Sequence, residues 1–154
     1  ITLRVAFEGF APRVRGWLDR VEDPWLWGLF RHKVAESWVK PMGQGGVAIL
    51  GDAAHPTLPF LAQGASMGLE DAWVLAQSLA THDSPAAALT AYQSARKPRT
   101  SRIVAAANAN ARAYHLTGLP RMIGHTGLRL LGRVSPGTML SRFDWLYDHD
   151  VTQG

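Results

Sequence analysis

The sequence contains no cysteine, which excludes disulfide bonds, thiolate metal sites and cysteine nucleophiles. No apolar run reaches the about 18 residues that a membrane-spanning helix requires. Residues 1–7 include no methionine and lack the layout of a signal peptide. We therefore expect a cytoplasmic location and a chain that begins inside a longer polypeptide.

Acidic side chains are missing from a long part of the chain. No Asp or Glu occurs from Ser84 to Phe143, although nine of the 16 Lys and Arg residues lie there. Such a stretch is expected of a surface that binds an anionic partner. It is also expected of a solvated helical face whose acidic partners lie elsewhere in the fold. The sequence leaves both interpretations open.

The patterns that are present predict one mostly helical fold with a few short β-strands. With 154 residues, 47% of them hydrophobic, the chain is long enough to bury a core. Because proline disfavours helical backbone at the residue before it, we expect a kink or break at Lys97. Apolar spacing and Pro or Gly boundaries predict helices over residues 8–20, 65–81, 89–96, 103–114, 119–131 and 139–147.

Strands are predicted at residues 25–32, 37–41 and 47–50. The first is rich in aromatic residues and partly alternates, as strands do. Residues 47–50 form a continuous apolar run, which is typical of a strand covered on both faces. The glycine-rich segment 42–46 precedes a strand instead of following one, so it is a turn and not a phosphate loop.

Apolar side chains at helical spacing should anchor the helix predicted over residues 65–81. The residues that we expect to face the core are Leu69, Ala72, Trp73, Ala76 and Leu79.

The most specific pattern of the chain follows the strand at residues 47–50. The pair Gly51-Asp52 places a carboxylate at the carboxyl end of that strand, where ligands of open α/β sheets bind. Asp52 could accept hydrogen bonds from polyol hydroxyls, or it could cap the following turn through its own backbone. Spacing alone does not decide between these roles.

A stiff loop then leads into the helix. Pro56 and Pro59 restrict the backbone of this loop, and Gly64-Ala65 begins the helix without bulky side chains near its free N–H groups. The positive end of a helix favours an anionic group. An ordinary loop-to-helix junction would show the same pattern.

Together these residues resemble a known motif. The string Gly51-Asp-Ala-Ala-His-Pro56, followed by Gln63-Gly-Ala65 and Glu70-Asp-Ala72, resembles the second flavin-binding motif of the single-component FAD-dependent aromatic hydroxylases. These are the class A flavoprotein monooxygenases, and the likeness is strongest to the salicylate hydroxylase and 3-hydroxybenzoate 6-hydroxylase branch. The resemblance covers nearly the whole chain and is most marked over residues 38–100.

The resemblance implies a C-terminal fragment of an α/β FAD/NAD(P)-binding, Rossmann-like monooxygenase fold. Residues 1–41 would be the end of the substrate domain, and residues 42–82 the second half of the FAD-binding domain. Residues 83–154 would be the C-terminal helical region. The GxGxxG unit that holds the nucleotide half of FAD in this family does not occur in the sequence.

Site residues follow from the same resemblance. It implies that Asp52, after Gly51, binds the ribityl hydroxyls of FAD and that Pro59 lies near the flavin ring. The backbone N–H groups of Ala65 and Ser66 would meet the N1–C2=O edge of the ring, and Gly64 would keep that approach open.

Other members of the motif are expected to be structural. His55, Glu70 and Asp71 would contribute packing, helix-start electrostatics and hydrogen bonds. Ala62 departs from the family pattern, because many relatives have glycine there and alanine has less freedom at positive φ.

The implied function is hydroxylation of an aromatic substrate with FAD, NAD(P)H and O₂. We expect the 154-residue chain alone to be inactive, since it lacks the nucleotide-binding part, which would be its missing partner. The alternative is a basic helical interaction module that binds nucleic acid or a membrane surface, which the lack of interleaved aromatic residues makes less attractive.

Two further expectations concern partners. Exposed Trp25, Trp27 and Phe30 would favour self-association of the chain. No metal site is expected, because the histidines lack metal-ligand spacing and Asp148-His149-Asp150 reads as solvated surface.

Overall fold

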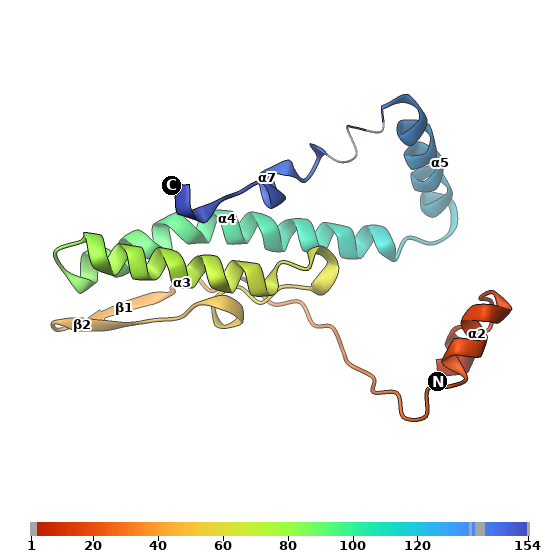
Figure 1. The fold of residues 1–154 in the computed structure, drawn as a ribbon, viewed down its shortest axis with the longest axis horizontal. Helices are drawn as coiled ribbons and strands as arrows, with labels where there is room; N and C mark the ends of the chain where they lie inside the picture. Colours follow the sequence, from red (N-terminus) through yellow and green to blue (C-terminus); the bar gives the residue numbers. More distant parts are fainter. Residues whose placement is uncertain (1–2, 136, 138–140, 154) are drawn as a thin grey trace.

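Two long helices lie side by side and carry a β-hairpin on one side (Figure 1). The computed structural model describes residues 3–135, 137 and 141–153. In chain order the elements are α1 (Leu3–Ala6), α2 (Pro12–Leu18), β1 (Val39–Met42), β2 (Gly45–Ala48), the short 3-10 helices η1 (Gly51–Ala53) and η2 (Pro59–Leu61), α3 (Gly64–Thr81), α4 (Pro85–Tyr114), α5 (Gly118–Val134), α7 (Asp144–Tyr147) and η3 (Val151–Gln153).

The hairpin confirms the predicted turn and the strand predicted before it. Strands β1 and β2 pair antiparallel, with Val39 opposite Ala48 and Met42 opposite Gly45. Gly43 begins the two-residue loop at a φ of 56°, a conformation that glycine adopts without steric cost. A Cβ on Gly46 would lie 2.5 Å from Leu89 Cδ1, so a glycine here lets the hairpin pack against α4.

The expectation that residues 47–50 are covered on both faces was wrong. In the part of the chain that the structure describes, the sheet has two strands, and α4 packs against it. Val47 therefore keeps 56% of its surface exposed, while Trp38 is buried with Ala54 and Tyr92.

The strand predicted at residues 25–32 is also absent. This segment has no regular secondary structure, and Trp25, Trp27 and Phe30 are 81%, 80% and 76% exposed. Aromatic residues favour strands because they pack on a sheet surface, and no neighbouring strand pairs with this segment among the described residues.

Helix α3 forms where it was predicted, but it buries a different face. Met67, Asp71 and Ser78 are buried. The residues that we expected to face the core are exposed instead. Leu69 is 74% and Trp73 48% exposed, and Ala72 and Ala76 are exposed as well. The apolar spacing misled the prediction because the inward face is built around a buried carboxylate.

Helix α4 is continuous, so the break expected at Lys97 does not occur. Its 30 residues include Pro98, which costs the helix one backbone hydrogen bond. Arg96 and Arg99 on either side of Pro98 are both ion-paired to α3. These contacts hold the helix through the proline. At its start, the Ser84 hydroxyl accepts a hydrogen bond from the Ala87 amide at 3.2 Å and caps the helix.

The remaining α-helices are shorter than α3 and α4. Helix α2 begins at Pro12 inside the predicted range 8–20, and α5 covers the range 119–131. Helix α7 lies within the range 139–147, of which residues 139–140 fall outside the described residues. In Figure 1, α2 and α5 lie away from the α3–α4 pair, and none of their residues is buried.

None of the helices in the described ranges combines the length and the apolar character needed to cross a bilayer.

Candidate functional site

The Gly51-Asp52 turn lies directly against the first turns of α3. Gly51 has a φ of 56°, and its amide donates a hydrogen bond of 3.0 Å to Asp71 Oδ2. Its Cα and that of Gly68 are close enough that a Cβ on Gly51 would lie 3.9 Å from Gly68 Cα. The positive φ favours glycine at residue 51, and the turn leaves the Asp52 side chain exposed.

The start of α3 offers free donors next to that carboxylate. Gln63 precedes the helix without a side-chain capping bond, and no acidic residue lies in its first turn. The first amides of a helix have no partner within the helix, and Ala65 and Ser66 are exposed there. A Cβ on Gly64 would lie 4.0 Å from Asp52 Oδ1 and 3.6 Å from Thr57 Cγ2.

These observations place four of the six predicted site residues around one helix end. Gly64, Ala65 and Ser66 form the first turn of α3, and Asp52 lies beside Gly64. Pro59 is exposed on η2 and is connected to α3 through Ala62 and Gln63. The arrangement combines hydrogen-bond donors, a positive helix end and an acceptor carboxylate on one surface.

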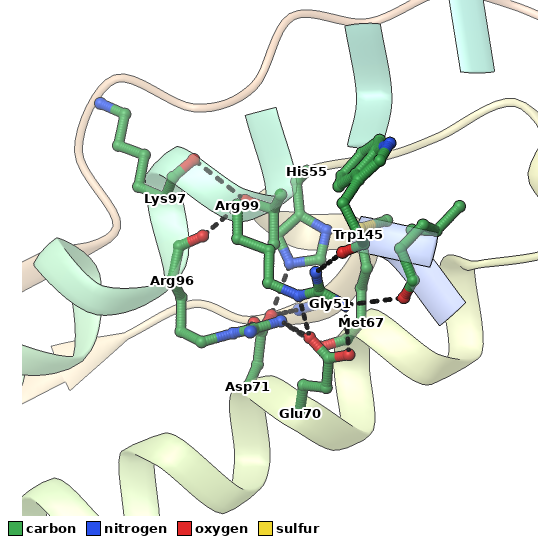
Figure 2. Close-up of polar contacts among 11 residues, drawn as sticks. Gly51, His55, Met67, Glu70, Asp71, Arg96, Lys97, Arg99 and Trp145 are labelled. Carbon is green, nitrogen blue, oxygen red and sulfur yellow. Dashed lines mark hydrogen bonds and ion pairs between the residues drawn. The ribbon is translucent and has the colours of Figure 1, made fainter. Parts of the chain in front are cut away.

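Beneath this surface, Asp71 is a fully buried junction. Its Oδ2 accepts from the Gly51 amide and lies 2.5 Å from His55 Nε2, while Arg96 Nε donates to its Oδ1 at 2.8 Å. A carboxylate can only accept, so His55 Nε2 carries the hydrogen. Figure 2 shows these side chains converging from the Gly51 turn, α3 and α4. Asp71 thus joins the turn to both long helices.

Glu70 forms a second, less buried junction. Arg99 donates to both of its carboxylate oxygens, at 2.9 and 3.0 Å, and Arg96 lies 2.6 Å from Oε2. Arg99 also donates to the carbonyls of Trp145 and Leu146, each at 3.2 Å (Figure 2). This bidentate pair fixes α3, α4 and the segment before the C-terminus to one another.

Both acids are held in their charged forms. Burial on its own would raise the pKa of Glu70, but hydrogen bonds from Arg99 and the charge of Arg96 outweigh it, so this pKa is lowered. For Asp71, burial is likewise outweighed by the hydrogen bonds from His55, Arg96 and the Gly51 amide, and the pKa is lowered. Burial and the nearby Asp71 charge raise the pKa of Tyr92, whose hydroxyl donates to the Ile49 carbonyl at 3.0 Å.

The expected structural role of His55, Glu70 and Asp71 agrees with these contacts, but their partners were not foreseen. Arg96 and Arg99 are three positions apart and so share a helix face. Their spacing opposite the adjacent pair Glu70-Asp71 was the signal that could have revealed the network.

The loop between the turn and α3 contains one strained residue. Ala62 adopts a left-handed conformation, with φ 53° and ψ 33°. A non-glycine residue in this region costs about 1–2 kcal/mol. Alanine therefore keeps the loop shape that glycine would take freely, and the neighbouring Leu61 is buried.

No group of three or more potential metal ligands occurs in the described ranges. Residues 148–150 are exposed, and the Asp150 carboxylate accepts hydrogen bonds from Thr152 and Gln153.

Comparison with known proteins connects this geometry to a family. Residues 26–107 match the family described as FAD binding domain. A 3-hydroxybenzoate 6-hydroxylase from Klebsiella oxytoca is 40% identical over 118 residues, which cover 76% of this chain and 29% of that protein. A salicylate hydroxylase from Pseudomonas putida is 35% identical over 150 residues, covering 95% and 32%. A 3-amino-4-hydroxybenzoate 2-monooxygenase from Streptomyces platensis is 34% identical over 148 residues, covering 95% and 35%.

These matches confirm the resemblance that the motif at residues 51–72 predicted. The chain spans about a third of the length of these relatives.

Proposed function

Because the chain belongs to the FAD binding domain family, we propose that it supplies the flavin-ring and ribityl part of the FAD site of an aromatic hydroxylase. In this proposal residues 42–82 are the second half of the FAD-binding domain, residues 1–41 the end of the substrate domain and residues 83–154 the C-terminal helical region. The wider fold would be Rossmann-like.

One observation carries the proposal. The uncapped N-terminus of α3 and the exposed Asp52 carboxylate lie on the same surface, with Gly64 between them. A ligand that presents hydroxyls to one end and an electron-rich polar edge to the other would satisfy both groups. The ribityl arm and the ring of a flavin have this chemistry.

The residues present therefore fit the cofactor. Asp52 would accept hydrogen bonds from the ribityl hydroxyls, and the amides of Ala65 and Ser66 would donate to the polar edge of the ring. Gly64 would leave room for that edge, and Pro59 would border the ring from η2. Asp71 would hold the Gly51 amide and so keep the Asp52 turn in place.

When bound, FAD would accept a hydride from NAD(P)H and use O₂ to hydroxylate an aromatic ring. The contribution of this chain is positional and electrostatic. The positive end of α3 would stabilise negative charge at the polar edge of the ring without reorganisation, because its amides are fixed by the helix.

The family match does not favour the alternative of a stand-alone basic interaction module. Residues 84–143 still form a basic region, but its Arg96 and Arg99 are occupied by Glu70 and Asp71. Part of the acid-free stretch is thus balanced by acids elsewhere in the fold.

Titration of the chain with FAD, followed by flavin fluorescence and compared between wild type and Gly64→Ala, tests the proposal. A Cβ at residue 64 meets its neighbours at ordinary van der Waals distances, so the fold should tolerate it. It would nevertheless occupy the approach to the first amides of α3. Overpacking of this kind costs about 1–3 kcal/mol, which is roughly a five- to 160-fold loss of affinity.

Gly127→Ala is the matched control, because it is also a helical glycine and a Cβ there meets nothing within 4 Å. It should leave flavin affinity unchanged. Equal affinities for wild type and Gly64→Ala would contradict the proposed ring contact.

We further propose that the 154-residue chain alone binds FAD weakly and does not catalyse hydroxylation, since it contains no GxGxxG unit for the nucleotide half. NAD(P)H-dependent hydroxylation of salicylate or 3-hydroxybenzoate by this chain would overturn that part of the proposal.

A further inference from the structure

We propose that the segment 143–147 is a brace that sets the conformation of the loop 59–62, and that Arg99 and Tyr147 are its positioning residues. The inference rests on the proposed function, in which this loop borders the flavin ring. The brace itself follows from contacts between parts of the chain that are more than 80 residues apart.

The loop 59–62 has few means of holding its own shape. Its one internal backbone hydrogen bond in the described contacts runs from the Ala62 amide to the Pro59 carbonyl, at 3.1 Å. Ala62 is held at positive φ, which an unconstrained alanine avoids. A strained residue persists only where its surroundings determine its conformation.

The segment 143–147 supplies such surroundings. Leu146 is buried in one cluster with Leu61, Met67 and Ile103. The Tyr147 hydroxyl donates to the Leu61 carbonyl at 3.4 Å. The residue before the strained Ala62 is therefore held at its carbonyl by Tyr147. Its side chain is packed by Leu146 together with residues of α3 and α4.

Arg99 fastens the brace to the helices. Its guanidinium binds Glu70 on α3 and donates to the carbonyls of Trp145 and Leu146. One turn further along α4, Arg102 lies over the Trp145 ring, 3.7 Å from its centroid. These contacts hold both the loop and the first turns of α3 in register with one another.

The other side of the loop is covered by α4. The Phe60 ring lies 5.7 Å from Tyr114 and 6.0 Å from His115, measured between ring centroids. Phe60 thus restricts the loop through its contacts with the end of α4, while Leu61 restricts it through its place in the buried cluster. Removing either Leu61 contact should release Ala62.

The test measures hydrogen exchange of the Ala62 amide by NMR in the 154-residue chain. Tyr147→Phe removes only the hydroxyl of a half-exposed ring, and it should raise the Ala62 exchange rate about two- to tenfold. Leu146→Ala should raise it further, and Leu146→Met should restore most of the protection because methionine keeps the volume.

Matched controls make the same chemical changes elsewhere. Tyr92→Phe removes a hydroxyl that donates to the Ile49 carbonyl, and it should increase exchange of the Ile49 amide but not of Ala62. Leu128→Ala on α5 should change neither amide. An unchanged Ala62 rate in both Tyr147→Phe and Leu146→Ala would overturn the brace.

A flavin readout separates positioning from packing. If wild type binds FAD, Tyr147→Phe should alter the visible circular dichroism of the bound flavin or weaken its affinity, whereas Tyr92→Phe should do neither. Raised Ala62 exchange with unchanged flavin affinity and spectrum would overturn the positioning role. Absence of FAD binding by the wild type would contradict the proposed function, while raised Ala62 exchange would still support the brace.

Discussion

The body of the molecule, residues 34–114 and 143–147, differs sharply from its two arms, residues 3–33 and 115–135. The body holds both hydrophobic clusters and the buried ion pairs of Asp71 and Glu70. The arms contain no buried residue, although they are rich in large apolar side chains. Their ion pair, Arg4 with Asp19, is exposed on both partners.

The difference shows that apolar composition alone does not define a core. Leu26 and Trp27 on the N-terminal arm are more exposed than Arg96 and Asp71 in the body. What distinguishes the body is that its buried acids and arginines are paired with one another and that its apolar groups surround those pairs. Among the described residues, His55 Nδ1 is a buried polar atom without a hydrogen-bond partner. The proposed flavin contacts all lie in the body.

The largest expected effect comes from breaking a buried ion pair. Asp71→Ala leaves Arg96 Nε, His55 Nε2 and the Gly51 amide without their acceptor, although Arg96 keeps its contact with Glu70. It should lower the free energy of unfolding by about 3–5 kcal/mol. Asp19→Ala on the arm breaks an exposed pair of 2.8 Å and should cost about 0–1 kcal/mol. Chemical denaturation of both variants measures the contrast, and equal losses would contradict it.

Low pH should reduce the stability of the body, because it protonates the carboxylates of Glu70 and Asp71. The folded pKa values of Glu70 and Asp71 lie below their ordinary values of 4.5 and 3.8. Each group therefore adds stability that is present above its ordinary pKa and is lost as the pH falls through its lowered folded pKa. The contribution of these two acids to the free energy of unfolding should therefore be level above about pH 5 and fall below about pH 4.5.

Denaturant titrations at a series of pH values test this dependence, with Glu70→Gln as the comparison. In Glu70→Gln, the free energy of unfolding should fall less on acidification than it does in the wild type. A wild-type stability that is unchanged down to about pH 3 would be inconsistent with the buried pairs.

A smaller effect of opposite sign is expected in the loop. Ala62→Gly removes the cost of the positive φ, which is about 1–2 kcal/mol, but it also adds conformational entropy to the unfolded chain. The net gain in the free energy of unfolding should therefore be at most about 1 kcal/mol. Ala105→Gly, at an exposed position inside α4, should instead lose about 1 kcal/mol. Thermal unfolding of both variants checks the signs, and a loss at residue 62 would argue against the left-handed conformation.

The smallest effect on stability should come from the arm. Trp27→Ser removes a side chain that is 80% exposed, and it should change the free energy of unfolding by less than about 0.5 kcal/mol. It should nevertheless reduce self-association, which analytical ultracentrifugation at high concentration can measure. Wild type that is monomeric at high concentration would remove the premise of this prediction.

The sequence predicted the parts of the body whose signals are local. The turn at residues 42–46 and the helix after Gly64 depend on glycine conformations and helical spacing, and both occur. The likeness to flavin hydroxylases depended on one motif, residues 51–72, and the comparisons confirm it.

The features that were not predicted depend on long-range contacts. The inward face of α3 is set by Asp71, whose partners come from two other segments of the chain, the turn with Gly51 and His55 and the helix α4 with Arg96. Pro98 remains helical because flanking arginines are held by α3. The strand expected at residues 25–32 fails because a strand requires a neighbour that local composition cannot provide.

The central claim is that this chain contributes the ring half of a flavin site and not the nucleotide half. Competition binding with riboflavin and ADP tests it most directly. Riboflavin should displace FAD from the chain with similar affinity to FAD itself, and Asp52→Ala should weaken both, whereas ADP should displace none. Displacement of FAD by ADP, or equal FAD affinity for Asp52→Ala and wild type, would contradict the account.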